Sequence, residues 1–376
     1  MADGTTRSSR WKTDRLQNGR GGTRAGDGDL RPSASDLRLP LPSRRRAMAS
    51  CKSACFLSCD WGSSAFRLRL VRRSDCTVMD ELRSGDGAAV LARRRTAAER
   101  RKAFEGVLAD RVARLLRRHG LTAAEVPVAV SGMASSSIGW RELPYAGVPF
   151  RVDGRDAIAA SVPFGTAGAR GRALLVSGIR TGDEALRGEE AELLGFFSRP
   201  EWRGMADDCV VVLPGTHSKH AVVRRGAVTD FRTYMTGELF AVLSAHSMLR
   251  HSVEPEGRGA QGAKGSRAFE AGVACAKGRP LSEALFRVRT NGLFRRHEAG
   301  ANAAFLSGVL IGAEAHDLAA RGGRSPVVLC ANARLQVPYA QAFEQAGIYP
   351  RLSVLGAAEA DRLSVQGHGV LLDRLG

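Results

Sequence analysis

The stretch Asp60-Trp61-Gly62-Ser63-Ser64 separates the apolar run 56–59 from the alternating run Phe66-Arg67-Leu68-Arg69-Leu70-Val71. This pattern predicts a strand, a tight turn and a second strand. Glycine lets an anion approach the backbone closely, and the N–H and hydroxyl groups of such a turn bind its oxygens. A carboxylate at the end of the first strand can hold Mg²⁺ directly or through water. The stretch therefore predicts a phosphate-binding turn.

A second unit of the same kind lies in the other half of the chain. A predicted strand at 209–213 runs into Pro214-Gly215-Thr216-His217-Ser218-Lys219, and predicted strands at 220–224 and 227–232 follow. One phosphate turn in each half is what a nucleotide clamped between two domains requires. The sequence contains no G-x-x-x-x-G-K-[ST] loop and no G-x-G-x-x-G after a predicted strand, so the commoner nucleotide folds are not indicated.

The remaining pattern alternates strands and helices. Thr96 and Glu99 form a capping box that opens a helix ending near Gly120, and the acidic residues in 187–194 suit the first turn of another helix. Further strands are expected at 77–82, 126–130, 173–177, 327–329 and 352–354, and further helices at 237–250, 266–276, 301–320, 335–346 and 358–366.

Length and composition indicate a folded α/β chain. The 376 residues are enough for two domains, and 44% hydrophobic residues with 43 glycines and 14 prolines exclude collagen-like and wholly disordered classes. No apolar run approaches the ~18 residues of a membrane span, because the best candidates stop at Pro214 and Glu314. A soluble cytoplasmic protein without a membrane partner is expected.

The net charge of +18 raises the question of nucleic acid as a partner. Only six of the 56 basic residues are lysines, however, and this skew indicates codon usage in a GC-rich genome rather than a selected phosphate-binding surface. Nucleic acid is therefore not expected as a partner. Seven cysteines, an odd number, fit a reducing compartment, and Cys51, Cys55 and Cys59 lack the second ligand pair of a zinc site.

We expect three parts in the chain. Residues 1–53 are rich in Arg, Ser and Gly and predict a disordered basic arm, or a mis-annotated start if Met48 is the first residue. Residues 54–205 would form an N-terminal domain with the first phosphate turn. Residues 206–376 would form a C-terminal domain with the second phosphate turn.

Several spaced blocks, in order from about residue 55 to the end, resemble the 2-dehydro-3-deoxygalactonokinases. They are Asp60-Trp61-Gly62-Ser63-Ser64-Ala65-Phe66-Arg67, Ser131-Gly132-Met133 with Gly139-Trp140 and Pro144-Tyr145, Arg187-Gly188-Glu189-Glu190, Leu213-Pro214-Gly215-Thr216-His217-Ser218-Lys219, Asp230-Phe231-Arg232-Thr233 with Met235-Thr236-Gly237-Glu238, and Phe305-Leu306-Ser307-Gly308 with Ile311-Gly312-Ala313-Glu314. The resemblance implies a two-domain actin, hexokinase and Hsp70-like ATPase fold, with ribonuclease H-like domains around a central cleft. It also implies transfer of the γ-phosphoryl group of ATP to the C6 hydroxyl of 2-dehydro-3-deoxy-D-galactonate in galactonate catabolism.

The resemblance implies roles for both turns. Asp60, Gly62, Ser63 and Ser64 would form the first phosphate loop, with Asp60 organising Mg²⁺. The second loop would be formed by Gly215, Thr216, His217 and Lys219, although Pro214 stands where many relatives have an acidic residue. His217 also fits a plain turn histidine bonded to the backbone.

The general base must be a carboxylate within reach of the substrate alcohol. Glu189 and Glu190 are the first candidates, because a glutamate in a similar setting activates water in exopolyphosphatase relatives. Both also fit the ordinary acidic first turn of a helix. Asp60 and Glu238 are the other contenders.

The sugar acid requires a cation for its carboxylate, and Arg141 and Arg232 are the candidate forks, although each also fits a solvated surface arginine. Gly132 and Met133 of the small-residue loop, with Trp140, would shape the sugar pocket, whereas Trp140 equally fits a core residue. Thr236 and Glu238 complete the expected substrate set.

The adenosine region departs from the family. Asn332 stands near an expected glycine, where it tolerates left-handed backbone angles but adds a side chain. Pro338 fits only within the first turn of the following helix. These changes predict weak ATP binding or an altered phosphoryl donor.

Two other functions stay open beside the kinase. A relative of the same fold that hydrolyses polyphosphate or nucleotide would release phosphate without a sugar acid. A binding module that uses the basic arm and takes ATP as a switch would bind nucleic acid with a steep salt dependence. The sequence leaves the oligomeric state open.

Overall fold

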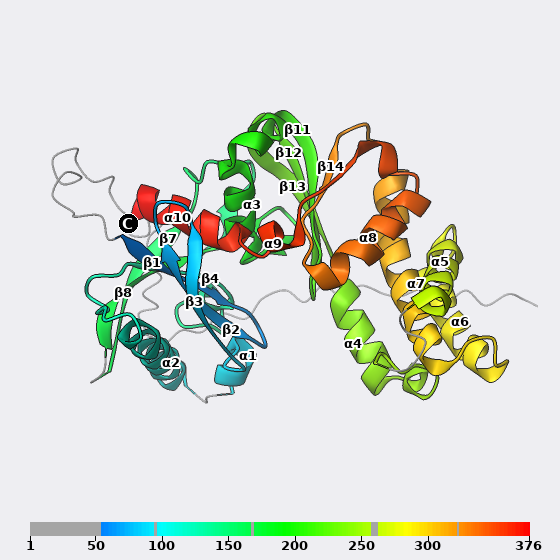
Figure 1. Cartoon of the computed structure of the whole chain (residues 1–376), viewed down its shortest axis with the longest axis horizontal. Helices are drawn as coiled ribbons and strands as arrows, with labels where there is room; N and C mark the ends of the chain where they lie inside the picture. The colour runs from blue at the N-terminus through cyan, green and yellow to red at the C-terminus, as the bar shows by residue number, and fades with distance from the viewer. Residues whose placement is uncertain (1–53, 94–95, 167–168, 257–261, 322) are drawn as a thin grey trace, which may run out of the picture.

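The computed structural model describes residues 54–93, 96–166, 169–256, 262–321 and 323–376. The predicted arm 1–53 lies outside the described residues. The described chain is elongated, with one sheet at the left of Figure 1, a second sheet near the middle and a group of helices at the right.

The first sheet has the strand order β3-β2-β1-β4-β8-β7. Strands β1 (Cys55–Trp61), β2 (Phe66–Arg72) and β3 (Thr77–Ser84) are antiparallel, and β4 (Val128–Gly132) and β8 (Ala169–Val176) continue parallel to β1. Strand β7 (Ala159–Thr166) is antiparallel to β8. Helix α2 (Ala97–Arg117) buries Phe104, Leu108 and Val112 on this sheet and begins at the expected capping box of Thr96 and Glu99.

The second sheet repeats this arrangement in the order β15-β14-β11-β12-β13-β6. Strands β11 (Asp208–Leu213), β12 (Ser218–Arg224) and β13 (Ala227–Tyr234) are antiparallel, and β14 (Val327–Leu329) and β15 (Leu352–Val354) run parallel to β11. Three antiparallel strands followed by two parallel ones are the ribonuclease H-like order. Because the order occurs twice, the predicted actin, hexokinase and Hsp70-like fold is confirmed.

Helices α3 (Glu189–Ser198) and α10 (Leu363–Leu375) join the two sheets. One hydrophobic core contains Phe56 and Ala129 of the first sheet, Val211 and Val328 of the second, and residues of both helices, such as Leu194. The helices pack with their backbones in contact: a Cβ atom on Gly195 would lie 1.9 Å from the Leu363 carbonyl oxygen, and one on Gly367 would lie 1.8 Å from that of Ala191. The C-terminal helix thus packs beside the N-terminal strand β1 (Figure 1).

The other elements complete both halves. The short sheet has the order β10-β9-β5, and the helices at the right of Figure 1 follow β13. The remaining bounds are α1 (Ala88–Leu91), β5 (Ala146–Gly147), β6 (Phe150–Arg151), β9 (Ile179–Arg180), β10 (Ala185–Leu186), α4 (Thr236–His246), α5 (Gly262–Ala276), α6 (Leu281–Leu293), α7 (Ala299–Ala320), α8 (Ala333–Gln345) and α9 (Ala357–Ala360), with 3₁₀ turns at Met133–Ser135, Pro200–Asp207, Met248–His251 and Tyr349–Arg351.

The two sheets do not divide the chain at a single point. Strand β6 comes before β7 and β8 of the first sheet in the sequence, yet it pairs with β13 of the second sheet. Helix α10, at the end of the chain, packs against α3 and β1. The expected boundary near residue 205 stays a prediction. Among the described residues, only α7 has the length and composition of a membrane span, and 61% of its apolar window is buried inside the protein, as in a core helix.

The expectation for Pro338 is wrong. Pro338 lies inside α8, beyond the first turn, where it cannot donate a backbone hydrogen bond. The following residues Tyr339, Ala342 and Phe343 are buried in the core of the second half, and this packing holds the helix together past the proline.

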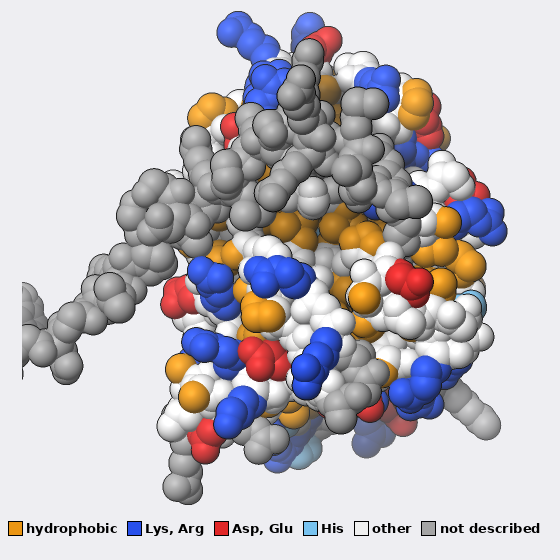
Figure 2. Space-filling view, turned by 90° about the vertical axis from the view of Figure 1, so that its left-hand side faces the viewer, with side chains coloured by type: hydrophobic (Ala, Val, Ile, Leu, Met, Phe, Trp, Pro, Cys, Tyr) orange, Lys and Arg blue, Asp and Glu red, His pale blue; other side chains and the backbone are white. Residues whose placement is uncertain are grey.

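Surface charge on the described residues is divided into small groups. Figure 2 shows Lys and Arg side chains scattered over the left-hand end of the molecule, with Asp and Glu side chains between several of them. Within the described residues several basic side chains are paired, for example Arg111 with Asp86 at 2.8 Å. The charges that Figure 2 shows on the described residues are thus of both signs.

The contact between α3 and α10 predicts the effect of a single added methyl group. Gly195→Ala forces the two backbones apart, so we expect the free energy of unfolding to fall by at least about 2 kcal/mol. Urea unfolding measures the change. The matched control is Gly106→Ala in α2, where no atom lies within 4 Å of the new Cβ, and where we expect a gain of up to ~1 kcal/mol. Equal stability of the Gly195 variant and the wild type would contradict this account.

Candidate active site

The first predicted phosphate turn lies at the carboxyl end of β1. The Gly62 N–H donates to the Ala65 carbonyl oxygen at 2.9 Å, and the Gly62 and Ser63 carbonyl oxygens accept hydrogen bonds from Ala88 and Ala89 of α1. Ser63 and Ser64 are exposed. The turn is therefore held by backbone bonds, and its hydroxyl groups face solvent.

Asp60 is half-exposed beside this turn. Its Oδ2 accepts from Arg67 Nη2 at 3.0 Å, and Arg67 Nη1 also reaches Asp361 Oδ1 at 2.8 Å. Burial alone would lower the pKa of Arg67, but the two carboxylates outweigh it and raise the pKa above its usual value. Arg67 is the last residue of the motif at 60–67, but the sequence alone assigned it no role. The arginine orients the Asp60 carboxylate and ties it to the segment before α10.

Two glycines let the N-terminus of α3 approach the carboxyl ends of β1 and β4. Gly132 of β4 pairs with Trp61 and has φ +88°, and a Cβ on it would lie 2.6 Å from the Trp61 carbonyl oxygen. Gly188, at the N-terminus of α3 with φ +114°, lies against Gly132. A side chain at either glycine would push α3 away from the first turn. Glu189 and Glu190 thus begin their helix next to the Asp60 strand.

Glu189 joins the two halves of the molecule. Its Oε1 lies 3.1 Å from Lys219 Nζ of β12, and its Oε2 accepts from the Arg187 N–H at 3.0 Å. The Lys219 side chain is 5% exposed and that of Glu189 22% exposed, so water screens the pair only in part. Both residues were predicted for the site, but their pairing was not.

Glu190 is buried instead. Its Oε2 accepts from the Gly188 N–H at 2.6 Å, and its Oε1 has no partner among the described residues. Burial raises the pKa of Glu190 to about 8. Burial, with the nearby charges of Glu189 and Asp60, also raises the pKa of Glu192 on the next turn to about 8. Glu192, which sequence reasoning missed, lines a small cavity between the halves with Arg67, Pro214 and Asn332.

The second predicted turn is packed against the N-terminus of α4. A Cβ on Gly237 would lie 2.5 Å from the Gly215 carbonyl oxygen, and the Glu238 N–H donates to the Thr216 carbonyl oxygen at 3.0 Å. His217 Nε2 bonds Glu238 Oε2 at 2.5 Å, so the ring contacts a carboxylate here rather than the backbone, and its role as a phosphate ligand stays a prediction.

Glu314 of α7 holds the strand and helix that flank the second turn. Its carboxylate accepts from Ser218 Oγ at 2.5 Å and from Thr236 Oγ1 at 2.7 Å, and it lies 2.7 Å from His220 Nε2. Burial acts to raise the pKa of Glu314, but these hydrogen bonds and His220 lower it below its usual value. Thr236 was predicted to touch substrate; here it is buried and bonded to Glu314.

A cavity of 550 Å³ opens beside the second turn. Gly215, Thr216, Gly237 and Asn332 contribute to its wall, and so does the apolar surface of Leu335 and Tyr339. This volume falls in the range of small-molecule sites. The cavity is continuous with the backbone of the Gly215-Thr216 turn, because both residues line it.

The backbone expected at Asn332 is not the one observed. Asn332 has φ −68° and ψ 166°, an extended conformation, and its side chain caps α8 by accepting from the N–H groups of Arg334 and Leu335. The residue therefore replaces a glycine turn by an N-cap. Its side chain remains on the cavity wall.

The predicted sugar-acid residues lie in different places. Trp140 is 5% exposed and packs in the core under α2, so the core alternative describes it, and Met133 packs partly against the same core. Arg141 is exposed, and within the described part of the chain its side chain has no hydrogen bond or ion pair. Arg232 faces the opposite side of the second sheet from Lys219 and lines a separate pocket.

Arg187 orders the loop that carries Arg141. Its Nη1 donates to the Ser135 carbonyl oxygen at 2.6 Å, and its guanidinium lies 4.1 Å from the centre of the Tyr145 ring. Arg187 is the first residue of the motif at 187–190, and the sequence alone assigned it no role. Because the Arg187 guanidinium is bonded within the protein, Arg141 is the basic side chain of this loop that has no hydrogen bond or ion pair among the described residues.

The residues present suit one divalent cation held through phosphate and water. Asp60 Oδ1 makes no hydrogen bond within the described residues, and the half-exposed carboxylate can take a cation ligand or its water. In the same part of the chain, no three His, Cys, Asp or Glu side chains form a ready metal cage. A cation there would complete its shell with phosphate oxygens and water.

The ribonuclease H-like strand order, which occurs in both sheets, defines the actin, hexokinase and Hsp70-like fold class. The family model described as 2-keto-3-deoxy-galactonokinase matches residues 60–366. The chain belongs to this family.

Two relatives and one crystal structure agree with this assignment. A probable 2-dehydro-3-deoxygalactonokinase of Rhizobium meliloti (strain 1021) is 31% identical over 299 residues, which cover 79% of this chain and 91% of the relative. The 2-dehydro-3-deoxygalactonokinase of Escherichia coli (strain K12) is 29% identical over 303 residues, which cover 78% and 91%. A crystal structure from Sinorhizobium meliloti that bears the same enzyme name has a TM-score of 0.67 at 30% identity and covers 83% of this chain and 97% of its own.

The buried Glu190 predicts a pH dependence of stability. Its carboxyl keeps its proton to about pH 8 when folded but ionises near 4.5 when unfolded. The unfolded chain therefore binds fewer protons between these values, and the free energy of unfolding falls as the pH rises. Glu190→Gln removes this loss, so we expect its stability relative to wild type to increase by on the order of a few kcal/mol from pH 5 to pH 8.

Urea unfolding at several pH values measures this difference. The exposed Glu344→Gln variant is the matched control, and its offset from wild type should stay constant. A Glu190→Gln offset that does not change with pH would show that the buried carboxyl does not hold its proton.

Proposed function

We propose that the protein transfers the γ-phosphoryl group of ATP to the C6 hydroxyl of 2-dehydro-3-deoxy-D-galactonate, as a cytoplasmic enzyme of galactonate catabolism. The main support is that Asp60, Glu189 and Lys219 come from distant parts of the chain: Glu189 pairs with Lys219 at 3.1 Å, and the charges of Glu189 and Asp60 both act on the neighbouring Glu192. The family match from 60 to 366 includes all three and names the substrate class.

In this proposal the two turns bind the phosphates. Backbone N–H and hydroxyl groups of Ser63 and Ser64 hold one side of the triphosphate, with Gly62 shaping the turn, and Gly215 and Thr216 hold the other. The base and ribose occupy the cavity by Asn332. A Mg²⁺ ion organised by Asp60 would neutralise charge on the β- and γ-phosphates.

Glu189 is the general base of the proposal, and Glu190 positions it. A base must be ionised and accessible, and Glu189 is partly exposed and paired with a cation. Glu190 is buried with a pKa of about 8, and it holds the Gly188 N–H at the start of the helix. When phosphate oxygens attract Lys219, Glu189 is released to accept the proton of the substrate hydroxyl. Arg141 provides the cation for the substrate carboxylate.

The activity is tested with an assay that couples ADP release to Mg-ATP and a panel of 2-dehydro-3-deoxy sugar acids. We expect turnover that depends on the sugar acid and falls by at least about 100-fold in Asp60→Asn, because the cation loses its organiser. Release of ADP and phosphate without sugar would instead support the hydrolase alternative. No turnover with any sugar acid would contradict the proposal.

The two glutamates are separated by their kinetics. We expect Glu189→Gln to lower kcat by about 10²–10⁴-fold with little change in the KM for ATP. Glu190→Gln should keep more than a tenth of the wild-type kcat, since an amide can still accept the Gly188 hydrogen bond. Glu344→Gln, on the exposed side of α8, should match the wild type. A larger loss in Glu190→Gln than in Glu189→Gln would reverse the two roles.

A further inference from the structure

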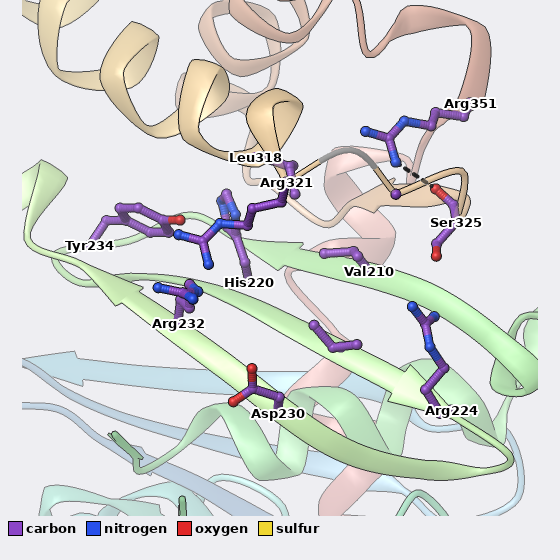
Figure 3. A pocket seen from close by; sticks show the side chains of 12 residues that line it. Val210, His220, Arg224, Asp230, Arg232, Tyr234, Leu318, Arg321, Ser325 and Arg351 are labelled. Atoms are coloured by element: carbon purple, nitrogen blue, oxygen red, sulfur yellow. Dashed lines mark hydrogen bonds between the residues drawn. The ribbon is translucent and has the colours of Figure 1, made fainter. Parts of the chain in front are cut away.

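A second, separate pocket lies on the face of the second sheet that α7 covers. It is a cavity of 160 Å³ between β12, β13 and the C-terminal end of α7, and it shares no lining residue with the 550 Å³ cavity of the candidate active site, which lies further toward the N-terminal end of α7. Figure 3 shows this pocket with the strands below and α7 above. Lys219 and His220 are neighbours on β12 and face opposite sides of the sheet, so the pocket lies on the face away from the Glu189–Lys219 ion pair.

The pocket is strongly basic. Arg224, Arg232, Arg321 and Arg351 line it, and Asp230 is its one carboxylate. In Figure 3 the guanidinium groups of Arg232 and Arg321 lie at the end near Tyr234, and those of Arg224 and Arg351 lie at the other end. Asp317 and Asp208 pair with two of these arginines, so among the described residues the unpaired charges at the cavity are those of Arg232, Arg351 and Asp230, and their sum is positive and favours an anion.

Arg232 is the cation in this pocket that is available to a ligand. Arg321 is paired with Asp317, Arg224 with Asp208, and Arg351 donates to the Ser325 carbonyl oxygen at 3.1 Å. Arg232 is exposed and makes no hydrogen bond or ion pair within the residues that the structure describes. A free guanidinium fork beside three others matches the planar, multidentate recognition of an oxyanion.

His220 supplies a second, independent observation. Its side chain is 4% exposed, it lines the pocket, and its Nε2 lies 2.7 Å from Glu314. Its Nδ1 is buried with no hydrogen-bond partner among the described residues. Buried polar atoms normally have a partner, so this nitrogen is an unsatisfied group on a residue that lines the pocket.

The state of this imidazole indicates which anion fits. Nε2 faces a carboxylate and therefore carries a proton, which leaves Nδ1 as an acceptor in the neutral ring and as a donor in the imidazolium. A singly ionised phosphate has both a P–OH group and P–O⁻ oxygens, so it can satisfy Nδ1 in either state. A carboxylate can only accept.

We propose that this arginine pocket is a binding site for a phosphate group, carried by inorganic phosphate or by a small phosphate monoester. Arg232 and Arg321 bind its oxygens, and His220 bonds it from the floor of the pocket. The site is distinct from the phosphate turns of the candidate active site.

The pocket is linked to the second turn by three hydrogen bonds that meet at Glu314. His220 bonds Glu314, and Glu314 accepts from Ser218 and Thr236, which flank the Gly215 turn and the start of α4. A phosphate that bonds His220 Nδ1 therefore changes the hydrogen bonding of the carboxylate that holds the turn. Occupancy of the pocket should alter the KM for ATP, and this consequence, unlike the binding itself, rests on the proposed kinase function.

Binding is tested by titration calorimetry of the full chain with inorganic phosphate and with glycerol 3-phosphate. A non-hydrolysable ATP analogue with Mg²⁺ is present to fill the phosphate turns. We expect one site, with affinity at least about tenfold weaker in Arg232→Gln and in Arg321→Gln. Arg203→Gln, an exposed arginine outside the pocket with the same charge change, should bind within about twofold of wild type.

Comparing the three ligands tells free phosphate from a phosphate ester, and phosphate from a carboxylate. Tighter binding of glycerol 3-phosphate than of inorganic phosphate assigns the site to an ester, and the reverse assigns it to free phosphate. Malonate, a dicarboxylate, should bind more weakly than both. Equal binding of malonate, or equal weakening in Arg203→Gln, would overturn the phosphate site in favour of a general charge effect.

The link to the turn is read from kinetics. With saturating ligand, the KM for ATP should change at least about twofold in wild type and not in Arg232→Gln. A KM that does not respond while calorimetry still reports the Arg232-dependent site would overturn the link but not the site. An enzyme without sugar-acid kinase activity would fail the proposed function alone, since the calorimetric result does not depend on turnover.

Discussion

The backbone contact between α3 and α10 is the constraint on which the arrangement of both sheets depends. Gly195 and Gly367 let two helices from distant parts of the chain approach so closely that no side chain fits between them. One face of this pair covers the first sheet and the other joins the core of the second. Because α3 is fixed in this way, its N-terminus is fixed relative to both sheets.

The position of the α3 N-terminus determines where the charged groups of the site lie. Gly132 and Gly188 bring the start of α3 to the strand end of Asp60, and the Lys219 ion pair brings β12 to Glu189. Desolvation raises the pKa of Glu190, whereas the half-exposed Glu189 keeps a cation beside it. Neighbouring carboxyl groups on one helical turn thus take different roles, because one is buried and the other is paired.

Local sequence patterns predicted the two strand-turn-strand units of this structure well. The hairpins around 60–64 and 214–218, the capping box at Thr96 and strand β14 follow from alternation, turn residues and caps, and the structure confirms them. Strand β7 was missed because Pro163 and Gly165 interrupt its pattern, and helix α6 was missed as well. Propensity also failed at Pro338, where packing maintains the helix past a residue that breaks helices in isolation.

Pairings across long distances could not be predicted from one sequence. Nothing in the spacing of Glu189, Lys219, Arg67 and Asp361 indicates which of them meet, and the burial that separates Glu190 from Glu189 arises only in the fold. Arg232 shows the opposite error: its motif suggested the sugar site, but its position on β13 turns it to the other face.

The most direct test of the site is a crystal structure of Asp60→Asn with Mg-ATP and the sugar acid. The account predicts the γ-phosphate between the Ser63 and Gly215 turns, adenosine in the cavity beside Asn332, and the C6 hydroxyl within hydrogen-bond distance of Glu189. Nucleotide bound away from both turns, or a substrate hydroxyl facing a different carboxylate, would contradict it.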